Sequence, residues 1–158
     1  MKRSVRLFLC GLLPAALGFA MSMLLQRYTA SALTWTALGM FAPLFWAFAG
    51  WQLASAREKP WQTVAFVHAP ALLLWLLSLY QILWRGAWLQ SALGGVCQCF
   101  FLPFLTPAMA LAALFPTDSL WPAFTLAFAL MLLSFWLGAY LKQQHFKKKG
   151  AHHDQDQH

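Results

Sequence analysis

His68 is the only ionisable side chain well inside any of the long apolar stretches of this sequence. An ionisable group buried in a membrane is costly, so it is a candidate for function by default. Pro70 follows two residues later and frees a backbone carbonyl close to the imidazole. We therefore interpret His68 as a candidate ligand-binding residue. The alternative is a neutral histidine that only hydrogen-bonds a neighbouring helix.

Cys97 and Cys99 suggest two further kinds of chemistry, metal binding and thiol exchange. Residues two apart on a helix point about 200° away from each other, so these thiols cannot face one ion or bridge readily. A zinc site needs two more ligands, and none has the spacing of a known motif. We therefore expect no metal site and no cofactor. An intramembrane enzyme or thiol redox protein that uses His68 with Cys97 and Cys99 is kept as the alternative function.

Gln98 and Thr106 flank a stretch with two prolines, Pro103 and Pro107. Each proline removes a backbone donor and costs about 3 kcal/mol inside an ordinary helix. Thr106 followed by Pro107 is also typical of a helix start. We predict a helix to about position 102, a break across 103–106, and a short helix that ends near 115. Non-helical backbone at membrane depth usually lines a cavity, so we predict a ligand site formed by His68, Gln98 and Thr106.

The composition is that of a membrane protein. The chain has 158 residues, of which 61% are hydrophobic and only 9% are charged, far from the soluble norm of roughly 25% charged. A membrane-spanning helix needs about 20 mainly apolar residues. Five uncharged windows of this length occupy residues 7–26, 31–54, 62–84, 89–115 and 119–141. We predict an all-α fold, a polytopic membrane helix bundle with four full spans and a broken fourth segment, either re-entrant or proline-kinked.

The basic residues predict how the loops are placed. If all five windows cross, the Lys and Arg residues divide five against six, without the excess that short cytoplasmic loops carry. If window 89–115 enters and leaves on one side, nine lie with the N-terminus, and only Arg27 and Arg85 lie opposite. The nine are Lys2, Arg3, Arg6, Arg57, Lys59, Lys142, Lys147, Lys148 and Lys149. We therefore predict a plasma (inner) membrane protein with both termini cytoplasmic. The alternative is that window 89–115 crosses the membrane as a single proline-kinked helix, which gives five spans in all.

Function is the least determined property of this sequence. Residues 1–141 are predicted to form the transmembrane bundle, and 142–158 a flexible tail, first basic and then rich in His and Asp. The signatures of serine hydrolases, zinc proteases and phosphate-binding loops are missing. We predict a non-enzymatic membrane component, either a subunit of a larger assembly or a solute-binding, permease-like piece. Its expected partners are the lipid bilayer and another membrane subunit or a second copy, and not nucleic acid. Gly11 and Gly18 lie two turns apart on one face, so the first span can pack tightly there, either within the chain or against another chain.

Overall fold

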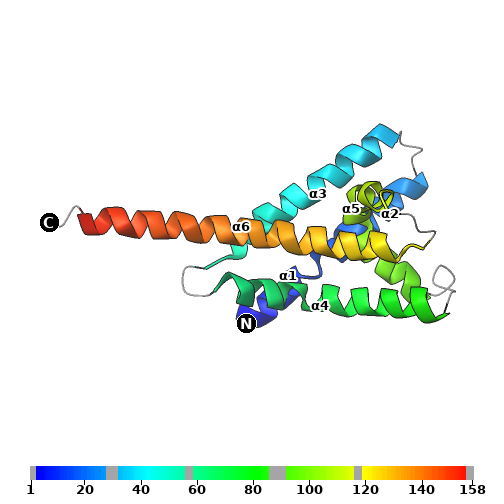
Figure 1. Cartoon of the computed structure of the whole chain (residues 1–158), viewed down its shortest axis with the longest axis horizontal. Helices are drawn as coiled ribbons and strands as arrows, with labels where there is room; N and C mark the ends of the chain where they lie inside the picture. The colour runs from blue at the N-terminus through cyan, green and yellow to red at the C-terminus, as the bar shows by residue number, and fades with distance from the viewer. Residues whose placement is uncertain (1–2, 28–31, 56–58, 86–91, 116–118, 156–158) are drawn as a thin grey trace.

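The computed structural model describes residues 3–27, 32–55, 59–85, 92–115 and 119–155, and all regular structure in these ranges is helical. In chain order the elements are α1 (Arg3–Cys10), α2 (Leu13–Arg27), α3 (Ala32–Leu53), α4 (Pro60–Tyr80), the π-helical turn η1 (Gln81–Arg85), α5 (Ala92–Ala112) and α6 (Trp121–Gln155) (Figure 1). Four segments are long and apolar enough to cross a membrane: Arg3–Arg27, Pro60–Trp84, Ala92–Ala112 and Trp121–Phe146. A shorter apolar stretch covers Ala37–Leu53. The predicted all-α membrane bundle is confirmed.

The first apolar window consists of two helices that meet at Gly11. Pro14 has no N–H to donate to the Cys10 carbonyl, so the helical ladder is interrupted between α1 and α2. The Gly11 N–H still bonds the Leu7 carbonyl at 3.0 Å, which ends α1. At this bend α1 touches the backbone of α4 so closely that a side-chain carbon on Gly11 would overlap the Val67 carbonyl oxygen. Gly11 therefore packs within the chain.

The predicted break in the fourth window is wrong. α5 is one α-helix of 21 residues, roughly 31 Å long, and it contains both Pro103 and Pro107. Pro103 cannot bond the Cys99 carbonyl, yet that carbonyl is covered by α2, where a side-chain carbon on Gly18 would overlap it. Neighbouring helices can stabilise a backbone group freed by proline in this way. The structure thus has one continuous proline-containing helix in place of two short helices. The side of the membrane at which each end of this segment lies stays a prediction.

α3 and α6 also meet backbone to backbone. A side-chain carbon on Gly50 would overlap the Phe135 carbonyl oxygen, and one on Gly138 would overlap the Ala47 carbonyl oxygen. Small residues permit this close approach, which membrane helices use because apolar burial drives association only weakly in lipid. The crossing fixes the middle of α6 against the C-terminal part of α3.

α5 lies across the bundle rather than along it. Its contacts step from one helix to the next: Cys97 touches α4, Phe101 packs against α6, and Thr106 meets α3. Figure 1 shows α5 nearly end-on, whereas α4 and α6 lie along the long axis and run in opposite directions. The chain therefore enters and leaves α5 toward the same end of the molecule.

The start of α1 and the exit of α6 lie together at the other end. The Arg3 guanidinium donates to the Leu53 carbonyl at 3.1 Å, and Lys142 Nζ donates to the Gln52 carbonyl at 3.1 Å, so both cations hold the end of α3. α6 then continues as a helix to Gln155, and free motion of the tail from 142 stays a prediction. Some of the cations counted above have no described side chain, namely Lys2, Arg57, Arg85, Lys147, Lys148 and Lys149.

The core lies where α3, α4, α5 and α6 converge. Its largest fully buried side chains are aromatic, and they come from three of these helices: Trp46, Phe100, Phe101, Phe124 and Phe135. The rings of Phe101 and Phe124 meet edge to face with centroids 5.8 Å apart. Two of these aromatic rings, Trp46 and Phe135, pack against His68, the residue from which the site is built.

Candidate functional site

His68 is buried in the middle of the bundle, with only 3% of its surface exposed. Its Nδ1 lies 2.9 Å from the Val64 carbonyl oxygen, one turn earlier on α4. The indole N–H of Trp46, on α3, points at its Nε2 across 3.2 Å. The rings of Trp46 and Phe135 pack against the imidazole with centroids 6.1 and 5.2 Å away. The side chain is therefore engaged on both ring nitrogens and both flanks.

These partners assign the protonation state of His68. An indole nitrogen only donates, so Nε2 must accept from Trp46, and a carbonyl only accepts, so Nδ1 must carry the proton toward Val64. A doubly protonated ring would set one N–H against another. The Met131 carbonyl oxygen, 3.4 Å from Nε2, is then no partner of the imidazole. The geometry describes a neutral histidine that joins α3 to α4.

The other two predicted ligand residues lie on α5 and contact different surroundings. Thr106 is half-buried, and its side-chain carbons face Gly39 of α3, where a further carbon would be crowded. Gln98 is also half-buried and lies about two turns earlier on the same helix. The hydrogen bonds of His68 go to neither of them. Ligand binding by His68, Gln98 and Thr106 stays a prediction.

The cysteines do not extend the histidine site. Cys97 is fully buried, and its Sγ lies 3.6 Å from the Leu74 carbonyl, which also accepts the Ser78 hydroxyl at 2.8 Å. Cys99 is half-buried, and all three cysteines are free thiols. Within the part of the chain that the structure describes, no group of three His, Cys, Asp or Glu side chains could hold a metal ion. The partners of His68 are an indole and backbone carbonyls, which is not a nucleophile–base arrangement.

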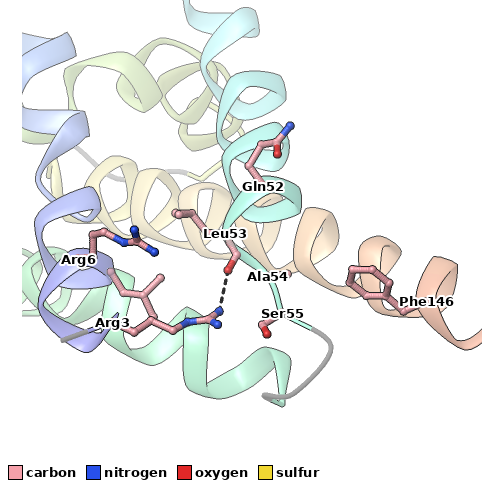
Figure 2. Close-up of a pocket in the computed structure, with 8 residues that line it drawn as sticks. Arg3, Arg6, Gln52, Leu53, Ala54, Ser55 and Phe146 are labelled. Atoms are coloured by element: carbon pink, nitrogen blue, oxygen red, sulfur yellow. Dashed lines mark hydrogen bonds between the residues drawn. The ribbon is translucent and has the colours of Figure 1, made fainter. Parts of the chain in front are cut away.

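A second site, which the sequence did not reveal, lies at the end of the bundle that holds the start of α1. It is a cavity of about 310 Å³ that we call the arginine pocket. Figure 2 shows Arg3 and Arg6 reaching from α1 toward the end of α3, with Phe146 of α6 on the opposite side. The remaining lining residues are Leu7, Gln52, Leu53, Ala54 and Ser55.

The arginine pocket is positively charged. Arg3 is half-buried and donates to the carbonyl of Leu53, the last residue of α3, where the helix dipole favours a cation. Arg6 is exposed, and it has no hydrogen-bond or ion-pair partner among the described residues. Lys142 does not line the pocket but contacts two residues that do, because its Nζ donates to the Gln52 carbonyl and lies 5.7 Å from the centroid of the Phe146 ring. None of the described lining residues is a carboxylate.

A smaller cavity of about 190 Å³ adjoins the arginine pocket between α1 and α4. It shares Arg3 and Leu7 with its neighbour and adds Ser4, Gln62 and Phe66. Arg3 thus lies between the arginine pocket, which both arginines line, and the smaller cavity, which Phe66 lines. One signal in the sequence could have indicated this site: Arg3 and Arg6 are three residues apart, which places both on one face of a helix.

The comparisons with other proteins are negative. The chain matches no protein family, no curated protein and no solved structure.

Proposed function

We propose that the protein is a non-enzymatic membrane component, a subunit that takes its place in a larger assembly. The observation that carries this proposal is the packing of His68. Its two ring nitrogens bond Trp46 and Val64 inside the core, so the one ionisable group deep in the apolar windows acts as a link between helices. A general base or a solute ligand needs a ring nitrogen that faces substrate.

The permease-like alternative has less support. Its expected site comprised His68, Gln98 and Thr106 around a break in the fourth window, and α5 is continuous there. The arginine pocket and its smaller neighbour lie at one end of the bundle, and none of these three residues lines either cavity. Interactions at a membrane surface therefore suit this fold better than passage through it.

The proposed location is the plasma (inner) membrane with both termini in the cytoplasm. Two observations support it. The cations Arg3 and Lys142 lie at one end of the bundle. In the sequence, nine of the 11 Lys and Arg residues lie in the two terminal segments and in the loop between the second and third apolar windows. Cytoplasmic loops carry such an excess. Reporter fusions to the N-terminus and after residue 155 should report the same cytoplasmic compartment, and opposite compartments would refute the orientation.

The subunit role is tested by capture from native membranes. The chain, tagged at its C-terminus and expressed at its natural level, is cross-linked in membranes and purified in a mild detergent. The expected result is a stoichiometric partner or second copy that is missing from a sample of untagged cells. A chain that purifies alone, with and without cross-linker, would overturn the role.

The surface that such a partner would use is not the pair of glycines expected from the sequence. Gly11 packs on α4 and Gly18 packs on α5, so both glycines make their close contacts within the chain. Exposed apolar side chains remain on the outer faces of the helices, including Phe41, Leu44 and Phe48 on α3. In a membrane these faces contact lipid or another subunit.

A further inference from the structure

We propose that the arginine pocket binds the phosphate group of an anionic phospholipid. The inference rests on the proposed orientation only for the leaflet that supplies the lipid. Binding by purified protein tests the pocket itself without reference to orientation or to a partner subunit.

The charge of the arginine pocket selects an anion. Arg3 and Arg6 both line it, Lys142 contacts its lining, and the described lining contains no carboxylate to neutralise them. Arg3 already bonds the Leu53 carbonyl, and that bond holds its guanidinium in place at the pocket wall. The exposed Arg6 guanidinium supplies the charge that remains without a described partner.

The donors of the arginine pocket fit a phosphate in particular. A guanidinium presents a planar fork of N–H groups that matches two oxygens of one phosphate. The Gln52 and Ser55 side chains at the end of α3 add neutral hydrogen-bonding groups to the same lining. A cavity of about 310 Å³ stands at the lower limit of ordinary ligand pockets, which suits a small headgroup rather than a large solute.

The neighbouring cavity favours a lipid over a soluble phosphate ester. It continues from Arg3 and Leu7 toward Phe66 on α4, whose side chain is half exposed on the outside of the bundle. A phospholipid also has a polar phosphate joined to an apolar part. With the phosphate at the arginines, the glycerol and the first carbons of a chain would lie along Leu7 and Phe66.

The test is titration of the purified full chain in a neutral detergent, with bound lipid counted by native mass spectrometry. Phosphatidylglycerol is the anionic probe, and phosphatidylcholine is the zwitterionic control. We expect saturable binding of phosphatidylglycerol that is at least about tenfold tighter than that of phosphatidylcholine. Both lipids have the phosphate, but the choline cation of phosphatidylcholine lies beside it and is repelled by the arginines. A tenfold difference corresponds to about 1.4 kcal/mol, which is within the range of such a repulsion at a separation of roughly 4 Å. Equal affinity for the two lipids would overturn the proposal.

Variants separate the pocket from general surface charge. Arg6→Gln should weaken phosphatidylglycerol binding about tenfold, and Arg6→Lys should weaken it less, because it keeps the charge and loses the fork. Lys59→Gln is the matched control, since Lys59 is an exposed cation outside the pocket lining. An equal loss in Lys59→Gln and Arg6→Gln would refute a defined site. Far-UV circular dichroism of each variant verifies that the helices are retained.

A soluble ligand is distinguished in the same titration. Glycerol 3-phosphate has the phosphate group without acyl chains, and we expect it to compete with phosphatidylglycerol only at much higher concentration. Competition at equal concentration would overturn the assignment to lipid and indicate a site for soluble phosphate esters. Because Glu58 lies outside the described residues, the variant Glu58→Gln is also titrated with both lipids. It should keep the preference for phosphatidylglycerol over phosphatidylcholine.

Discussion

Alanine at Gly18 should destabilise the protein, whereas alanine at Gly95 should not. Both glycines belong to apolar helical segments, but their surroundings differ. A side-chain carbon on Gly18 would overlap the Cys99 carbonyl, which is backbone and cannot rotate away. A side-chain carbon on Gly95 would meet nothing within 4 Å. The pair therefore compares the same chemical change with and without a steric cost.

The structure determines which of the two variants is less stable and the approximate difference between their free energies of unfolding. Replacing glycine by alanine inside a helix stabilises it by about 0.5–1 kcal/mol, because the unfolded chain loses freedom. Inserting a carbon into a tightly packed contact costs roughly 1–3 kcal/mol. Gly95→Ala should thus gain up to about 1 kcal/mol, and Gly18→Ala should lose about 1–2 kcal/mol, since α2 must move away from α5.

Reversible unfolding in mixed detergent micelles, followed by far-UV circular dichroism, measures this difference. The two variants should differ by about 2 kcal/mol in the free energy of unfolding, with Gly18→Ala the less stable. If Gly18→Ala unfolds at the same detergent composition as the parent, α2 does not cover the Cys99 carbonyl. The account of an unbroken α5 across Pro103 would then be refuted.

Three further predictions follow from the same contacts. Trp46→Phe and His68→Leu should each destabilise the chain. A double-mutant cycle should give a coupling of about 0.6 kcal/mol, the average for hydrogen bonds between membrane helices, and at most about 1.7 kcal/mol. A coupling of zero would exclude the bond. Arg3→Gln should lower the free energy of unfolding by about 0.3–1 kcal/mol, because a cation at the end of α3 is lost, and an unchanged value would contradict the cap. A membrane-permeant maleimide should modify Cys97 far more slowly than Cys99 in the folded protein, because Cys97 is buried. In denaturing detergent the two thiols should react equally fast. Equal rates in the folded protein would contradict the burial of Cys97.

Several parts of the fold could be predicted because they depend on local composition. An apolar window of about 20 residues must form a helix in a membrane, since hydrocarbon offers no partner for a free N–H or carbonyl. α4 begins at Pro60, two residues before the predicted window 62–84, and proline is favoured at the first position of a helix. The count of cations predicted that the N-terminus and the tail share a side of the membrane, and this stays a prediction. Within the bundle, Arg3 and Lys142 hold the same end of α3.

The error at Pro103 shows why other features could not be predicted. A proline opens the same gap in every helix, but only the fold decides what fills it, and here α2 approaches at Gly18. The transverse course of α5, which replaces the expected hairpin, likewise depends on contacts with three helices that are distant in sequence. Local sequence rules identified the proline that interrupts the helical hydrogen bonding. They could not identify the neighbouring helix that packs against the freed carbonyl.

The sequence by itself determined the class of this protein, its helical segments and the burial of His68, because these follow from how each residue partitions between water and hydrocarbon. The tertiary structure decided what the histidine bonds, which glycines meet which carbonyls, and that Arg3 and Arg6 enclose a cavity with the end of α3. Hydrogen bonds and close contacts act over a few ångströms, so they depend on which segments the folded chain brings together.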